Sequence, residues 1–340
     1  MSDSLLTEKA KPITNHSGYS KTGYMEAAIL QKPGNFIIKR VPMPVPSPEE
    51  VVFEVEGCGI CASNIPVFEG RDWYTYPASA GNPGHETWGK VVFVGSEVKK
   101  LKKGDRIAAL SHRGFALYDK VHAERAIKLP FELQMTEFPG EPLACAMNVF
   151  RRSDIRPGQT VAVTGVGFLG AIMIQLAKAA GAKVIALSKR EYSLQMAKKF
   201  GADEVITLID QWKVVEEVKE ITSGKLCDRV IEATGKEWPL SISGEITAER
   251  GKLIIAGYHQ EGMRQVNMHL WNWKGLDVIN AHERDPELHI KGMREAVDAV
   301  MSGRINPEPL YSRYSLSEIN EAFDGLLNRP DGYMKALIKM

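Results

Sequence analysis

The sequence has few cysteines and no long hydrophobic run. Its 340 residues contain four cysteines, Cys58, Cys61, Cys145 and Cys227. Because these are scattered and no secretion signal is recognisable, we expect reduced thiols rather than a disulfide framework. No uninterrupted apolar stretch approaches the roughly 18 residues that cross a bilayer. The sequence therefore predicts a soluble, cytoplasmic protein that does not act at a membrane.

An excess of either charge is also missing. The chain has 43 basic and 42 acidic residues, so nothing in its charge favours nucleic acid or anionic lipid as a partner. Its length is sufficient for two domains with cores of their own. Residues 1–24 are polar, carry no targeting pattern and are predicted to form a flexible tail.

The middle of the chain alternates short apolar runs with amphipathic stretches. This alternation is typical of a doubly wound parallel sheet of the Rossmann type. The runs that we interpret as strands or helices are residues 160–165, 168–180, 183–188, 191–200, 204–208, 212–222, 228–234 and 251–257.

Residues 25–150 differ, because strand-like runs at 27–30, 50–56 and 89–94 are separated by turns rich in Pro, Gly and Ser, with no comparable helices between them. They predict a mostly β domain of barrel type. We place the dinucleotide-binding domain at residues 151–290. The last residues, 291–340, contain strand-like and helical runs and are expected to return to the β domain, which makes the chain an α/β protein.

A glycine pattern follows the first strand of the α/β region. Gly165 suits a tight turn, Gly167 lets the backbone approach a pyrophosphate, and Gly170 lets helix and strand pack closely. Phe168 and Leu169 complete this turn at the helix N-terminus, whose free N–H groups attract an anion. The alternative interpretation is a glycine-rich turn without a ligand.

The second strand of this region ends at Ser188, followed by Lys189 and Arg190. An NAD site would place an acidic residue here for the ribose hydroxyls. A hydroxyl followed by two cations suits a ribose 2′-phosphate instead, since Arg190 can pair with it. We therefore predict NADP(H) rather than NAD(H). Alternatively, both cations are surface charges and Glu191 bonds the ribose.

Three N-terminal motifs contain residue types that a catalytic zinc uses: thiolate, imidazole and carboxylate. They are Cys61-Ala-Ser63, Gly84-His85-Glu86 and Glu141-Pro142-Leu143. With the glycine turn, they resemble the zinc-containing medium-chain dehydrogenase/reductase superfamily, and within it the sorbitol (polyol) dehydrogenase branch. The resemblance covers nearly everything from Met25 onward. It implies a GroES-like catalytic domain packed on the cofactor domain, with the active site in the cleft.

The resemblance also implies residue roles. Cys61 and His85 are expected to bind zinc, while Glu86 and Glu141 complete the sphere directly or through water, in an order that the sequence leaves open. Ser63 is expected to accept the alcohol proton, or else only to order its turn. A four-cysteine lobe found in many relatives is missing, so one zinc per chain is predicted. Asn64 replaces the family's Asp and Pro66 its relay histidine, for which His112 is a possible substitute.

The substrate pocket is the least readable part of the sequence. Its candidates by position are Trp73, Tyr74, Trp88, His269, Trp271, Asn272 and Trp273. We expect the segment 271–273 near the cleft, although aromatic side chains are equally good core residues. Polar groups beside aromatic faces suit a polyol, sugar or cyclitol. We interpret Cys58, Cys145 and Cys227 as packing residues.

The sequence thus predicts a zinc-dependent oxidoreductase, an alcohol or polyol dehydrogenase that moves a hydride between NADP(H) and a secondary alcohol or its ketone. The competing hypotheses are a catalytically inactive dinucleotide-binding protein and a zinc-free quinone or enoyl reductase of the same superfamily. Metal analysis separates them, because only the first binds zinc. The strand-like residues 276–281 are expected to pair across a two-fold axis, giving a homodimer or homotetramer.

Overall fold

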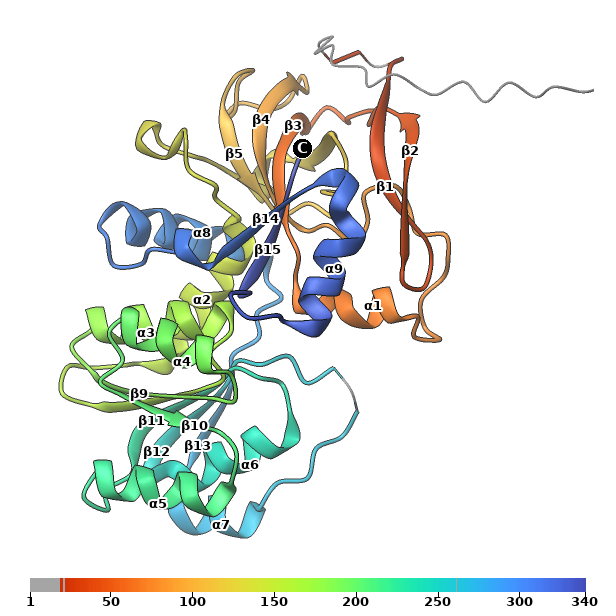
Figure 1. Cartoon of the computed structure of the whole chain (residues 1–340). Coiled ribbons are helices and arrows are strands. Elements are labelled where there is room, and N and C mark those ends of the chain that lie inside the picture. The colour runs from red at the N-terminus through yellow and green to blue at the C-terminus, as the bar shows by residue number, and fades with distance from the viewer. Residues whose placement is uncertain (1–18, 21, 261) are drawn as a thin grey trace, which may run out of the picture.

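The computed structural model describes residues 19–20, 22–260 and 262–340, so most of the predicted tail lies outside the described residues. The chain forms a β-rich half and an α/β half, which Figure 1 shows one above the other. In the described part of the chain, no helix has the length and apolar character of a membrane span.

The β-rich half is organised around a seven-stranded sheet in the order β14-β15-β3-β4-β5-β7, with β6 also paired to β3. A separate hairpin is formed by β1 (Tyr24–Lys32) and β2 (Asn35–Pro42). The strands of the sheet are β3 (Glu50–Gly59), β4 (Glu86–Val94), β5 (Arg106–Ala109), β6 (Tyr118–His122), β7 (Ala126–Lys128), β14 (Tyr311–Ser315) and β15 (Lys335–Lys339).

The C-terminal segment joins this half. Strand β15 runs antiparallel to β3, with Ile338 opposite Cys58. Helix α9 (Ile319–Asn328) follows a capping box at Ser315 and Glu318 and lies beside the short helix α1 (Ile65–Glu69). Their aromatic side chains pack with those of the β strands; the rings of Phe68 and Phe323, for example, stack 4.7 Å apart.

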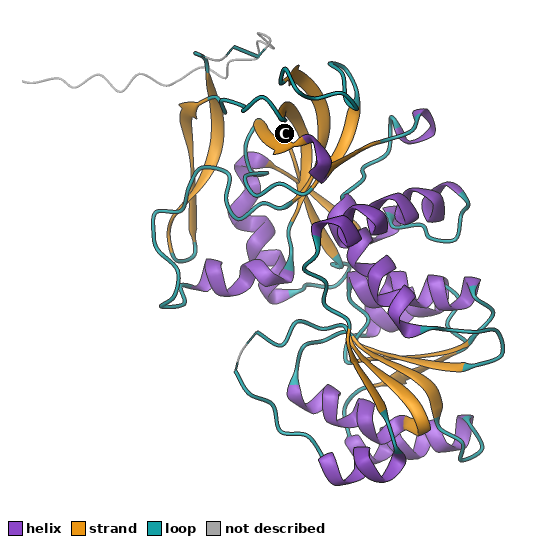
Figure 2. Ribbon diagram, turned by 180° about the vertical axis from the view of Figure 1, so that it is seen from behind, coloured by secondary structure: helices purple, strands orange, loops and turns teal. Residues whose placement is uncertain are grey.

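The α/β half is a parallel sheet of six strands in the order β10-β9-β8-β11-β12-β13, which confirms the predicted doubly wound fold. Figure 2 shows helices on both sides of the fan of strands. The strands are β8 (Thr160–Thr164), β9 (Lys183–Ser188), β10 (Glu204–Thr207), β11 (Cys227–Glu232), β12 (Thr247–Ile255) and β13 (Asp277–Asn280). The helices are α3 (Phe168–Ala179), α4 (Glu191–Lys199), α5 (Gln211–Ile221), α6 (Glu237–Ile246) and α7 (Met268–Lys274).

Two helices, α2 (Gly140–Ser153) and α8 (Pro286–Met301), lie between the halves and pack on each other. Helix α2, which has 14 residues, was not predicted from the sequence. Most of α2 is buried. In a parallel sheet of this strand order, ligands bind where the order reverses, here between β8 and β11.

Candidate active site

The pairing of β3 with β4 brings together a thiol, an imidazole and a carboxylate. Gly59 on β3 lies opposite Glu86, the first residue of β4, so Cys61 just after β3 meets His85 just before β4. The ligand atoms of Cys61, His85 and Glu86 all lie within 4.8 Å of one another. This is the mixed sulfur, nitrogen and oxygen set that catalytic zinc ions use.

The ring of His85 is oriented by its own turn. Its Nδ1 lies 3.0 Å from the carbonyl oxygen of Pro83, and the imidazole also hydrogen-bonds to Cys61. Burial opposes the charged ring, but the hydrogen bond and charge of Cys61, and then the charges of Glu141 and Glu86, raise the pKa of His85 to about 10. The surroundings of His85 therefore favour positive charge.

Glu86 is fully buried and pairs with a lysine from the C-terminal strand. The Lys335 ammonium donates to Oε1 of Glu86 at 2.5 Å and to the carbonyl oxygen of Ile60 at 3.0 Å. The other oxygen, Oε2, is buried without a hydrogen-bond partner among the described residues. A Cβ atom on Gly59 would lie 1.9 Å from Oε2, so only glycine leaves room for this carboxylate. Lys335 thus fixes Glu86 and leaves Oε2 available to a cation.

Glu141 lies in the first turn of α2 and belongs to a second group of metal-ligating residues, apart from Cys61, His85 and Glu86. Its carboxylate groups with Cys145 and His289, again within 4.8 Å, and it accepts a hydrogen bond of 3.3 Å from the Cys145 thiol. Burial and then the charge of Glu141 raise the pKa of Cys145 well above its usual range. Because Glu141 also raises the pKa of His85, it lies near both groups.

Sequence reasoning did not single out Cys145, His289 or Lys335 for the site. The spacing of Glu141 and Cys145, one helical turn, is a signal that was available. The position of Lys335, next to the apolar residues 336–338, was a second available signal. His289 had no sequence signal, since only the packing of α8 on α2 brings it near Glu141.

The two residues predicted to handle protons, Ser63 and His112, differ in their position relative to Cys61 and in their exposure. Ser63 lies two residues after Cys61, in the 3-10 turn Ala62–Asn64, and Asn64 is buried. His112 is exposed. Burial and then the positive charges of His85 and Arg125 lower the pKa of His112. His112 is therefore a solvent-facing base on the side of His85.

The glycine turn has the geometry that a dinucleotide requires. Gly165 has a φ of +99°, and a Cβ on Gly170 would lie 2.1 Å from the carbonyl oxygen of Gly165. A Cβ on Gly167 would meet nothing within 4 Å, so the backbone is open there. Phe168 and Leu169 begin α3, and the Phe168 ring lies 5.3 Å from the Lys335 ammonium. Lys335 thus contacts both the glycine turn and Glu86.

The end of β9 presents a hydroxyl and two cations. Ser188 accepts a hydrogen bond from the backbone N–H of Arg190 at 3.3 Å, and Lys189 lies over the ring of Trp238. The Arg190 guanidinium donates to the carbonyl oxygens of Tyr333 and Pro330 at 2.6 and 3.3 Å. A guanidinium has five N–H donors, more than these two bonds require.

Several candidate pocket residues are core residues instead. Trp88 is completely buried, and Trp271 packs in the core of the α/β half beside Gly244. Figure 1 shows α7, which carries residues 271–273, at the end of the molecule away from the β-rich half. The prediction that this segment lies near the cleft was wrong, because Trp271 fills a hydrophobic core rather than lining a site.

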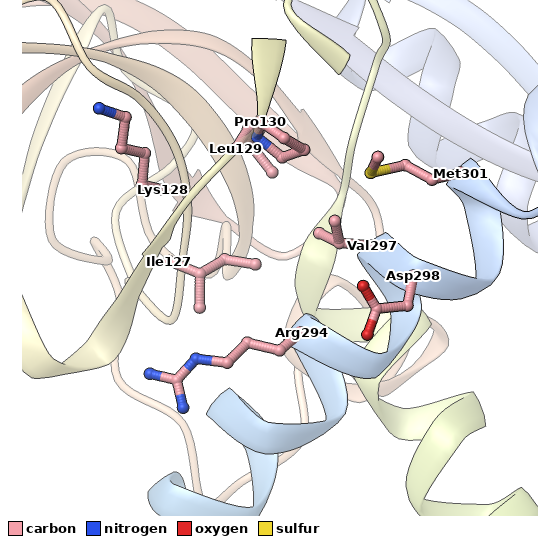
Figure 3. Close-up of a pocket in the computed structure, with 8 residues that line it drawn as sticks. All are labelled: Ile127, Lys128, Leu129, Pro130, Arg294, Val297, Asp298 and Met301. Atoms are coloured by element: carbon pink, nitrogen blue, oxygen red, sulfur yellow. The ribbon is translucent and has the colours of Figure 1, made fainter. Parts of the chain in front are cut away.

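A pocket of about 410 Å³ lies elsewhere, between the end of β7 and α8. Figure 3 shows its lining, residues 127–130 on one side and Arg294, Val297, Asp298 and Met301 on the other. It includes none of the residues around Cys61 or the glycine turn. We therefore assign it no part in the chemistry.

Comparison with known proteins gives a consistent result. Residues 169–300 match the family model described as zinc-binding dehydrogenase, and residues 47–130 match that of the alcohol dehydrogenase GroES-like domain. These matches confirm the predicted pairing of a GroES-like part with a Rossmann part. They also cover Cys61, His85, Glu86 and the end of the glycine turn.

Individual relatives span most of the chain. It is 28% identical to D-arabitol-phosphate dehydrogenase of Enterococcus avium, over 91% of this chain and 95% of the relative. It is 31% identical to an alcohol dehydrogenase of Rhizobium meliloti, over 59% of this chain and 68% of the relative. A solved zinc-binding dehydrogenase of Sinorhizobium meliloti, described as putative and bound to NADP, has a TM-score of 0.81 and 28% identity, over 94% of this chain and 100% of the other.

Proposed function

Because the chain belongs to the zinc-binding medium-chain dehydrogenase family, we propose that it transfers a hydride between NADP(H) and a secondary alcohol or its ketone. At the level of class it is an NAD(P)-dependent zinc alcohol or polyol dehydrogenase. The convergence of Cys61, His85 and Glu86 within 4.8 Å carries the proposal. A polyol, sugar or cyclitol is the proposed substrate class, supported by the similarity to a polyol-phosphate dehydrogenase.

One catalytic zinc fits the residues around Cys61. The set offers Sγ of Cys61, a ring nitrogen of His85 and Oε2 of Glu86, a buried atom that has no other partner among the described residues. We propose that these three hold the ion and that Glu141 approaches it through water. Zinc bound there would act as a Lewis acid toward the substrate oxygen.

The chain's own residues hold the reacting groups and the proton. Lys335 holds the Glu86 carboxylate in place through their ion pair, and the carbonyl of Pro83 orients His85. Ser63 Oγ is proposed to accept the proton of the substrate hydroxyl and pass it toward solvent. Burial of Glu86 and Lys335 keeps water away from this side of the site.

NADP(H) fits the end of β9 and the glycine turn. The backbone at Gly167 leaves space for a pyrophosphate at the N-terminus of α3. Ser188, Lys189 and Arg190 are proposed to bind the ribose 2′-phosphate, since no carboxylate occupies the end of the strand. The NADP-bound relative supports this proposal.

A screen tests the proposal directly. Polyols, cyclitols and keto sugars are incubated with NADP(H) or NAD(H), and the absorbance of the reduced cofactor is followed. We expect turnover with NADP(H) and one catalytic zinc per active chain. Cys61→Ala should abolish turnover and remove one equivalent of bound zinc, whereas Cys227→Ala, at a buried cysteine of the other half, should change neither. Full activity without zinc would contradict the proposal and favour a zinc-free reductase.

We also propose that two chains pair through β13. This strand is the edge of the parallel sheet in the described structure, and most of its residues are exposed. An open edge with exposed Val278 is suited to pairing with a second copy. Light scattering should give a dimer or a multiple of it, and Val278→Pro should shift it to the monomer. A wild-type monomer would refute this pairing.

A further inference from the structure

We propose that α2 and α8 form a second metal position, made of Glu141, Cys145 and His289, which takes a thiophilic divalent cation such as zinc. The ligand atoms of the three residues lie within 4.8 Å of one another. They combine a carboxylate, a thiol and an imidazole, as the group around Cys61 does. This position is separate from the one proposed for catalysis, although Glu141 lies near both.

The two helices bring the three residues together by close packing. Glu141 and Cys145 are one turn apart on the same face of α2. Helix α8 approaches α2 so closely that a Cβ on Gly292 would lie 2.9 Å from the carbonyl oxygen of Ala144. His289 is one turn before Gly292 and therefore reaches the same face of α2.

The tautomer of His289 suits a metal. Its Nε2 lies 3.0 Å from the carbonyl oxygen of Glu283; since a carbonyl only accepts, Nε2 carries the hydrogen and Nδ1 the lone pair. Nδ1 is buried, and no described residue hydrogen-bonds to it. A backbone carbonyl on one ring nitrogen and a free second nitrogen are typical of metal-binding histidines. His85 likewise has a backbone carbonyl oxygen, that of Pro83, beside one of its ring nitrogens.

The distances are close to those of a bound ion. Sγ of Cys145 and Oε1 of Glu141 are 3.3 Å apart, and two such ligands on a tetrahedral zinc are about 3.5 Å apart. On binding, the Cys145 thiol would lose its proton to solvent, and its S–H···O bond to Glu141 would be replaced by two bonds to the cation. A thiolate favours zinc or cobalt over magnesium or calcium.

The test uses the enzyme loaded with one equivalent of zinc, which is then titrated with cobalt(II). Thiolate-to-cobalt charge-transfer absorbance and total bound metal are measured together. We expect a second equivalent with this absorbance in the wild-type chain. Cys145→Ser should abolish the absorbance. His289→Gln should weaken binding by roughly 100-fold or more, since even the outer partners of metal ligands contribute about 10–100-fold.

His282→Gln is the matched control, because His282 is an exposed histidine just before α8, and it should bind cobalt as the wild type does. Binding of a single equivalent in total would overturn the proposal. So would charge-transfer absorbance that persists in Cys145→Ser, because cobalt would then be bound to Cys61, with zinc released. Circular dichroism verifies the fold of both variants, which lie on different helices. None of these measurements depends on dehydrogenase activity.

Discussion

Replacement of Lys335 by methionine tests how the buried carboxylate of the site is held. The ammonium and Glu86 are 2.5 Å apart, and their side chains are only 7% and 0% exposed. Methionine keeps most of the aliphatic stem but leaves the buried Glu86 without its ion-pair partner. Loss of one partner of a buried ion pair costs about 3–5 kcal/mol. We expect Lys335→Met to lower the free energy of unfolding of the metal-free chain by that amount.

Lys339→Met is the matched control on the same strand. Its ammonium lies 3.2 Å from Glu137, but the Lys339 side chain is 38% exposed. A pair whose cation is this exposed is partly screened by water, and we expect it to contribute about 1 kcal/mol. The two variants therefore remove the same group from the same strand with very different expected losses.

The effect of zinc on the Lys335→Met variant tests whether Glu86 faces the metal. If Oε2 of Glu86 faces the cation, zinc supplies the positive charge that Lys335→Met removes. Zinc should then stabilise this variant more than it stabilises the wild type. Urea unfolding followed by tryptophan fluorescence, with chelator or with zinc, measures both differences. Equal losses in the two lysine variants would refute the argument for the buried pair. A loss unaffected by zinc would show that Glu86 does not face the ion.

Three further predictions concern the cofactor and the metal ligand. Ser188→Asp with Arg190→Ala should shift the kcat/KM preference from NADP toward NAD by roughly 10–100-fold, because a charged hydrogen bond contributes about 1.5–3 kcal/mol. Gly170→Ala should lower the free energy of unfolding by about 1–3 kcal/mol, measured in urea, since its Cβ would overlap the carbonyl of Gly165. Mass spectrometry should find that iodoacetamide alkylates the half-buried Cys61 before the buried Cys58 and Cys227 in the metal-free chain, and that zinc protects Cys61.

Each of these has an internal control. Gly167→Ala adds a methyl group where the fold has open space, so it should weaken NADP binding without the loss of stability expected at Gly170. An unchanged NADP to NAD ratio in the double variant would refute the assignment of residues 188 and 190. Alkylation of the fully buried Cys58 before Cys61 would contradict the exposure argument.

The α/β half was predictable from sequence because each of its strands is a short apolar run next to a helix. The strands β8 and β9 begin and end within a residue of the predicted runs. Helix α2 was not predicted, since it opens with a glycine and a proline, the two residues with the lowest helix propensity. Trp271 was misplaced for a different reason: an aromatic side chain looks the same in sequence whether it lines a cleft or fills a core.

The site was predictable where its residues are close in sequence or belong to a motif. Cys61, His85 and Glu86 come together through the register of two neighbouring strands. Lys335 and His289 come from the C-terminal part of the chain, and their nearness to Glu86 and Glu141 depends on tertiary packing. No local pattern encodes such contacts.

The pairing of β15 with β3 imposes an order on folding. Ile338 and Cys58 are opposite each other in one sheet, yet the whole cofactor half lies between them in the chain. Closing so long a loop is slow, whereas β8 to β13 form from one continuous segment. We therefore expect the parallel sheet to form first during synthesis, and the seven-stranded sheet to form only after β14 and β15 have been made. In a ribosome-stalled chain that stops before residue 311, the parallel sheet should resist protease, whereas β3 should be cleaved.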